Sequence, residues 1–367
     1  MKFSSNYLPT LIIIFFSSIL IHCPKEPELS TLLNQRLVNS YDTSAAIDIY
    51  FTTLRKERVL SSKGCSNSYY SSSAGAELRY GSCKVNVPAE HNIGSLDQSV
   101  LGSKDKFFQM MSLQEMDASS YSAAVNLLPS KEIIVFVHGF NVPFEEAIYR
   151  AAQIKYDIKF PGSMFVYSWA AGEDSDSFIG QLFIKGIYET NFQNAINSRA
   201  SFRAFLDSLD ASGKTIHLIV HSMGHQIVLP VLAEKSKGTS SPFIKELILN
   251  APDYDYQEFN DLSQAIKKSS NRVTLYCSKG DNALIASQKV NGKPRAGMCG
   301  RFPGMDVINV NEVDDPVFGF GGLGHGYYSS RPILTDIYQV LLGIDVEKRL
   351  FIRKSGSGNS ENFVIRK

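Results

Sequence analysis

The chain has 367 residues, of which 44% are hydrophobic, and its formal net charge is +1. This length and apolar content suffice for one large core or two modest ones. Because 37 basic residues are balanced by 36 acidic ones, the composition predicts no nucleic-acid partner.

The N-terminus carries an apolar run from Leu8 to Ile21, followed by Cys23. A membrane-spanning helix needs about 20 apolar residues, so we interpret residues 1–22 as an export signal. The end of the run resembles a bacterial lipobox, in which Cys23 is lipidated, although His22 stands where a small residue is preferred. An ordinary cleaved signal and an uncleaved anchor are the alternatives. All three predict export to the cell envelope, with residues 23–40 as a tether.

The four remaining cysteines are an even number in a compartment where disulfides persist. Three pairings are possible. The pairing local in sequence, Cys65–Cys83 with Cys277–Cys299, closes two short loops, each contributing about 3 kcal/mol. The alternative for Cys277, which lies in an apolar strand, is a buried free thiol.

The elements alternate in a manner typical of a doubly wound, mostly parallel α/β sheet. We expect two N-terminal strands at one edge, a third strand at 107–111 and a helix at 119–128. Beyond residue 131, short apolar runs alternate with amphipathic segments. The expected strands are 47–53, 80–88, 133–137, 164–169, 216–220, 246–250, 272–277 and 306–310, and the expected helices are 145–158, 191–209, 226–235 and 256–267. Residues 41–345 therefore form the folded domain, and 346–367 form a charged, flexible tail.

Ser222 follows the apolar strand 216–220 and directly precedes a helical sequence. A serine on so abrupt a turn projects its hydroxyl at the sheet edge, as in a nucleophile elbow. The alternative is a serine that only caps the helix.

Two backbone amides are candidates for an oxyanion hole. Gly139 ends the strand 133–137 and permits an unusual backbone path, so that the amide of Phe140 points into the site. The amide of Met223, directly after the serine, is the second donor. The alternative for the first segment is a polar turn.

A nucleophilic serine needs a histidine base and a carboxylate that fixes the imidazole tautomer, in the chain order serine, acid, histidine. His325 is the one histidine beyond the elbow helix, and it lies in a glycine-rich loop after the last strand. Asp281 follows the strand 272–277 and is our first candidate for the acid. Asp253 is the alternative acid, and Asp255 is a weaker one, because an aspartate after a strand also caps helices.

Several motifs in a fixed order resemble a bacterial α/β-hydrolase family of unknown function, whose members carry a Val-His-Gly-Phe-Asn strand end and a His-Ser-Met-Gly elbow. The resemblance rests on Tyr80-Gly81, Cys83, Val87-Pro88, Phe136 to Asn141, Phe144 to Ala147, Phe160 to Gly162, Tyr167 to Trp169, Ala251 to Asp253, Asp281 to Leu284 and His325 to Tyr328. It implies the α/β-hydrolase fold. The chain departs from the usual elbow at Val220, where a glycine or another small residue is expected two positions before the serine.

We therefore expect an exported serine hydrolase that cleaves a carboxylic ester or thioester of a small molecule or lipid through Ser222, Asp281 and His325. No metal or cofactor is expected, and the N-terminal lipid or anchor is the expected contact with the membrane. The loop from Gly172 to Gly180 is either a lid or an ordinary surface loop. The alternative function is a lipoprotein that keeps the fold with weak or absent catalysis and acts in binding. The sequence leaves the oligomeric state open.

Overall fold

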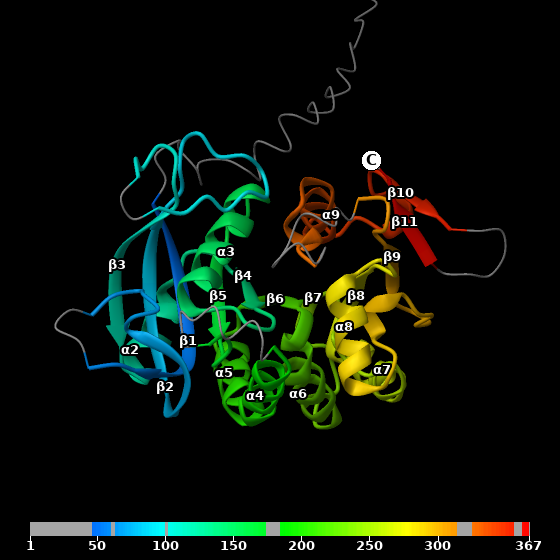
Figure 1. Cartoon of the computed structure of the whole chain (residues 1–367), viewed down its shortest axis with the longest axis horizontal. Coiled ribbons are helices and arrows are strands. Elements are labelled where there is room, and N and C mark those ends of the chain that lie inside the picture. The colour runs from blue at the N-terminus through cyan, green and yellow to red at the C-terminus, as the bar shows by residue number, and fades with distance from the viewer. Residues whose placement is uncertain are drawn as a thin grey trace, which may run out of the picture. The chain divides into compact units, whose positions relative to one another are not determined.

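The computed structural model describes residues 46–59, 63–99, 102–173, 184–313, 325–355 and 362–366. Within these ranges, eleven strands form one sheet in the order β10-β11-β9-β8-β7-β6-β4-β5-β1-β2-β3 (Figure 1). Three expected features lie outside the described residues: the signal, the tether and residues 174–180 of the loop that is either a lid or a surface loop.

The centre of the sheet is parallel, as expected from its alternation with helices. Neighbouring strands from β1 to β9 in this order pair in parallel, with β4 between β5 and β6. The strands are β1 (Ala46–Glu57), β4 (Glu132–Val137), β5 (Ser163–Ser168), β6 (Thr215–His221), β7 (Ile244–Asn250), β8 (Ser270–Cys277) and β9 (Asp306–Asn309). The predicted doubly wound α/β-hydrolase fold is confirmed.

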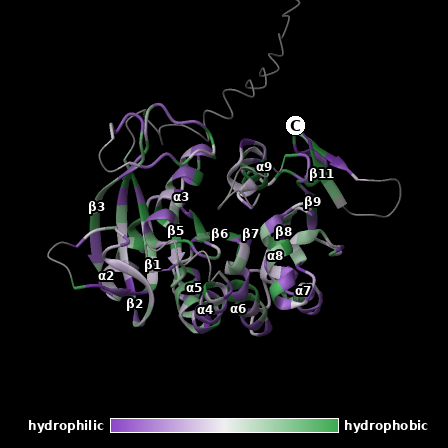
Figure 2. Ribbon diagram, in the orientation of Figure 1, coloured by the Kyte–Doolittle hydropathy of each residue, from purple (hydrophilic) through white to green (hydrophobic). Residues whose placement is uncertain are grey.

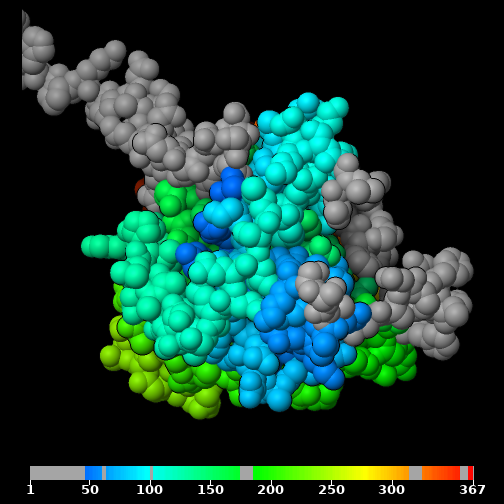
Figure 3. Space-filling view, turned by 90° about the vertical axis from the view of Figure 1, so that its left-hand side faces the viewer, coloured from blue at the N-terminus to red at the C-terminus, as the bar shows by residue number. Residues whose placement is uncertain are grey.

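The N-terminal strands lie at one edge, as predicted. β1 pairs antiparallel with β2 (Tyr70–Asn86), which pairs antiparallel with β3 (Gln109–Met116). Their residues cover one side of the molecule in Figure 3. The strand β2 begins at Tyr70, ten residues earlier than the expected start at residue 80. It therefore includes the serine-rich segment that we expected to be a loop.

The other edge of the sheet is formed by residues for which composition predicted only a flexible tail. β10 (Ile352–Lys354) pairs antiparallel with β11 (Asn362–Ile365), which runs parallel to β9. Arg349 is buried and contacts Asp306 and Asp336 at 2.8 and 3.1 Å. These residues therefore pack against the sheet, because Ile352, Phe363 and Ile365 are buried and the one buried charge in the described part of this segment, Arg349, is paired with two aspartates.

Helices cover both faces of the sheet. Side chains of α3 and α9 join one apolar cluster, and those of α2, α5, α6 and α7 join the other. The helices are α2 (Ala118–Leu127), α3 (Phe144–Asp157), α4 (Ile184–Asn197), α5 (Arg199–Ala211), α6 (His225–Lys237), α7 (Tyr256–Ser269), α8 (Asn282–Asn291) and α9 (Arg331–Leu341). Successive residues of β4 point to opposite clusters, which is why the strand is an unbroken apolar run (Figure 2).

The single helix expected at 191–209 is two helices, α4 and α5. They meet at Ser198, whose hydroxyl donates to the Asn194 carbonyl at 2.8 Å. The carbonyl of Ser198 accepts a hydrogen bond from the buried Tyr167 hydroxyl. The amphipathic pattern of residues 191–209 is continuous and does not reveal this break. The contact at the break comes from Tyr167 on β5, which is distant in sequence.

Both local disulfides are present. Cys65 is bonded to Cys83, and Cys277 is bonded to Cys299, so Cys277 is not a free thiol. The first bond ties the loop before β2 to that strand, and the second ties the end of β8 to the loop after α8. Among the described helices, none is long and apolar enough to cross a bilayer.

Candidate active site

The backbone is unusual where three central strands end. Asn141 after β4, Ser222 after β6 and Ala251 after β7 have φ angles of +53°, +51° and +49°. Positive φ is uncommon for residues other than glycine, and such conformations concentrate at functional sites. The carboxyl edge of the sheet is also where α/β proteins place their ligands.

Ser222 occupies an abrupt turn between β6 and α6. The residues Ser222–Gly224 form a single 3-10 turn, η2, and the helix begins at His225. The carbonyl of Ser222 accepts hydrogen bonds from His225 Nδ1 at 2.7 Å and from the Asp253 amide at 3.3 Å. These contacts hold the serine backbone in its strained conformation. The residue at the N-cap position of α6 is Gly224, not Ser222.

The loop after β4 lies directly against this turn. A Cβ atom on Gly139 would lie 2.7 Å from Ser222 Cβ, and one on Gly224 would lie 2.7 Å from the His138 carbonyl oxygen. Both approaches are too close for any residue except glycine. The two expected oxyanion residues, Phe140 and Met223, therefore belong to backbone segments in contact, while the Met223 side chain is buried in the core.

His325 and Asp281 are in contact, although 44 residues separate them. His325 Nδ1 lies 2.7 Å from Asp281 Oδ2. Asp281 is fully buried, and its other oxygen accepts the Leu284 amide at 3.0 Å as the N-cap of α8. One carboxylate thus holds both the imidazole and the start of a helix, so the capping and acid interpretations of Asp281 are compatible.

Asp253 and Asp255, the two rival aspartates, have other partners. Asp253 accepts from the hydroxyls of Ser287 at 2.5 Å and Tyr188 at 3.0 Å, and it lies 3.3 Å from Arg295 Nε. Asp255 caps α7 by accepting the Glu258 amide at 2.8 Å. Asp253 therefore belongs to a buried polar network beside the serine.

The histidines near the serine are buried and held neutral. Burial lowers the pKa of both His138 and His225 to about 3. Burial, followed by the influence of the facing His325 ring, lowers the pKa of His221 well below its usual value. His221 Nε2 lies 3.2 Å from the His325 carbonyl, so the neutral ring donates a hydrogen bond that holds the His325 backbone.

A cavity of about 180 Å³ opens over the serine. Ser222, His221, His325 and Phe140 line its floor together with Asp253. The remaining walls come from α3, α4, α8 and the segment after His325, with apolar surface supplied mainly by Val142, Tyr188, Ala283, Leu284, Ala286, Val290 and Tyr328. An apolar cavity with few convergent polar groups is typical of a small-molecule site.

Val220, the departure from the usual elbow, is accommodated in the core. It is fully buried, pairs with Val137 and Leu249 on the neighbouring strands, and belongs to the same apolar cluster as Met223. The strand β6 continues through Val220 to His221, directly before Ser222. The valine side chain therefore does not break the strand that leads to the serine.

Sequence reasoning missed Asn191, a buried residue of α4. Its side-chain oxygen accepts the amides of Asn141 at 3.1 Å and Gly172 at 2.9 Å. It thereby joins the loops that follow β4 and β5. Neither motif nor periodicity distinguishes such an asparagine from any other polar residue of a helix.

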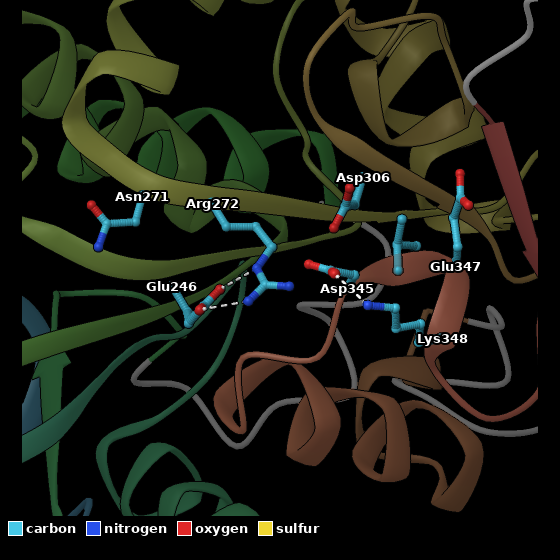
Figure 4. Close-up of a pocket in the computed structure, with 8 residues that line it drawn as sticks. Glu246, Asn271, Arg272, Asp306, Asp345, Glu347 and Lys348 are labelled. Atoms are coloured by element: carbon cyan, nitrogen blue, oxygen red, sulfur yellow. Dashed lines mark hydrogen bonds and ion pairs between the residues drawn. The ribbon is translucent and has the colours of Figure 1, made fainter.

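A second, larger cavity lies at the other end of the strands, where β7, β8 and β9 begin. It measures about 580 Å³, and two ion pairs join four of the six charged residues that line it (Figure 4). The other two, Asp306 and Glu347, pair with Arg349 and Lys354 outside the lining. Arg272 contacts Glu246 at 3.0 Å, and Lys348 contacts Asp345 at 3.3 Å. These pairs are structural.

The strand order, the strained serine turn and the acid–histidine contact after β8 define the class of α/β hydrolases. The chain belongs to the family described as alpha/beta hydrolases of unknown function (DUF900), whose model matches residues 114–344. No curated protein and no solved structure matches the chain.

Proposed function

We propose that this protein is a serine hydrolase that cleaves a carboxylic ester or thioester. The observation that carries the proposal is the 2.7 Å contact between Asp281 and His325, beside a cavity that both His325 and Ser222 line. Because a carboxylate accepts from Nδ1–H, the imidazole presents an unprotonated Nε2 that can take a proton from the serine hydroxyl.

In the proposed reaction, Ser222 Oγ attacks the substrate carbonyl carbon while its proton passes to His325 Nε2. The amides of Phe140 and Met223 donate to the resulting oxyanion, for which each donor contributes about 3 kcal/mol. Collapse of the tetrahedral intermediate breaks the bond to the alcohol or thiol, which leaves with the proton from His325. Water, deprotonated by His325, then releases the acid from the acyl-enzyme.

A fluorophosphonate probe tests this proposal, since it bonds covalently to activated serines. We expect labelling of the wild type and none of Ser222→Ala or of heat-denatured protein. As a matched control, Ser287→Ala removes a second serine hydroxyl of the cavity and should leave the labelled position unchanged, as read by peptide mass spectrometry. A correctly folded wild type that remains unlabelled would favour the alternative, a binding protein with weak or absent catalysis.

We also propose that the enzyme is exported and tethered to a membrane through Cys23. Support comes from the apolar run before this cysteine and from two disulfides, which persist in oxidising compartments. Metabolic labelling with an alkyne fatty acid should mark the wild type and not Cys23→Ala. Equal labelling of both would refute lipidation at this position.

A further inference from the structure

Arg150, on α3, lines the same cavity as Ser222 and His325. This cation has no part in the proposed catalytic steps. Its guanidinium lies 5.9 Å from the centre of the Tyr328 ring. The Tyr328 ring lies 4.0 Å from that of His221, which lies 4.7 Å from that of His325. Successive ring contacts therefore connect this cation to the candidate base.

Among the described residues, hydrogen bonds reach only one nitrogen of the guanidinium. Arg150 Nη1 donates to Gln153 Oε1 at 2.8 Å and to the Gly94 carbonyl at 3.4 Å. Across the part of the chain that the structure describes, no carboxylate forms an ion pair with Arg150. The planar guanidinium presents further donors in a fork that matches a carboxylate or phosphate.

The other charges of the cavity do not satisfy this cation. Glu146, one helical turn earlier, lines the same cavity without an ion pair to Arg150. Burial raises the pKa of Glu146, against the opposing effect of Arg150, and this disfavours its charged form. Asp253 is paired with Arg295, and Lys185 lies largely in solvent, 3.8 Å from Glu189.

We propose that Arg150 is a specificity-determining residue that binds an anionic group of the substrate. The inference rests on the proposed function and narrows its substrate class to esters with a carboxylate or phosphate some bonds away from the scissile carbonyl. The apolar wall formed by α8 receives the intervening carbon chain.

Two matched substrate pairs test this inference and reveal on which side of the ester the anion lies. The acyl-side pair is the 4-nitrophenyl monoester of glutaric acid and 4-nitrophenyl pentanoate. The alcohol-side pair is 1-butyrylglycerol 3-phosphate and 1-butyrylglycerol. The measured quantity is the ratio of kcat/KM for the charged ester to that for its neutral partner.

For at least one pair, we expect Arg150→Gln to lower this ratio about ten- to a hundredfold, since hydrogen bonds to charged groups have this magnitude. Arg150→Lys should retain part of the preference. Arg203→Gln removes an equivalent charge from α5, on the other face of the sheet, and should leave the ratio at its wild-type value. Ratios unchanged within twofold in Arg150→Gln for both pairs would overturn the inference.

The two proposals fail separately. Hydrolysis of the neutral esters that depends on Ser222 but shows no effect of Arg150 would leave the hydrolase in place and refute the anion site. If no ester is turned over, calorimetry on Ser222→Ala with glutarate and glycerol 3-phosphate tests the site directly. Saturable binding that Arg150→Gln abolishes would support it, and no binding of either anion would refute it.

Discussion

Replacing Asp281 by asparagine should nearly abolish turnover, because the change forces the wrong tautomer on His325. In the wild type, Oδ1 accepts the Leu284 amide and Oδ2 accepts His325 Nδ1. An asparagine has a single oxygen. If it keeps the contact with Leu284, its NH₂ group faces Nδ1, so that the proton moves to Nε2 and the ring cannot deprotonate Ser222.

The opposite amide orientation loses the helix cap, which costs about 1 kcal/mol, and places two donors against each other. We therefore expect kcat to fall about 10³- to 10⁴-fold, equivalent to about 4 to 5.5 kcal/mol of transition-state stabilisation. The assay is hydrolysis of 4-nitrophenyl pentanoate together with the rate of fluorophosphonate labelling, at pH 7.5 and with folding checked by circular dichroism.

Asp253→Asn is the matched control, because it is a buried aspartate of the same cavity. It weakens the contact with Arg295, and losing one partner of a buried ion pair costs about 3 to 5 kcal/mol of stability. The amide still bonds Ser287 or Tyr188, so kcat of the folded fraction should fall less than tenfold. A larger loss of kcat in Asp253→Asn than in Asp281→Asn would refute the reasoning and reassign the acid.

Three further predictions concern stability and the elbow. His138 and His225 are buried with pKa values lowered to about 3, below the usual 6.5, so their neutral forms stabilise the fold above pH 6.5 and this stability is lost as the pH falls toward 3. At pH 5 the two histidines together should lower the free energy of unfolding by about 4 kcal/mol, measurable by urea unfolding. Equal stability at pH 5 and pH 7 would contradict their burial. Gly139→Ala places a methyl group 2.7 Å from the elbow serine, so fluorophosphonate labelling should slow at least about tenfold, whereas Gly186→Ala, in open space, should not change it. Removing the Cys65–Cys83 disulfide with a double alanine variant should lower the free energy of unfolding by about 3 kcal/mol. In this variant, a reducing agent should lower the free energy of unfolding further only through the Cys277–Cys299 bond.

The sequence by itself determined the α/β class, the parallel centre of the sheet and the serine turn. These follow from patterns within single segments: apolar runs buried on both faces, helices between them, and Ser222 at a strand end. The break at Ser198 and the strands β10 and β11 escaped this reasoning, because contacts from distant segments produce them.

Only the tertiary structure decided which aspartate contacts His325, since all three candidates follow strands and two of them cap helices. The same holds for Asn191, which joins two loops at the site, and for Arg150, which resembles any other arginine of an amphipathic helix until the cavity is formed. Local sequence specifies which element a residue occupies. The partner of a buried polar group depends on how the elements pack, because its hydrogen bonds come from parts of the chain that are far apart in sequence.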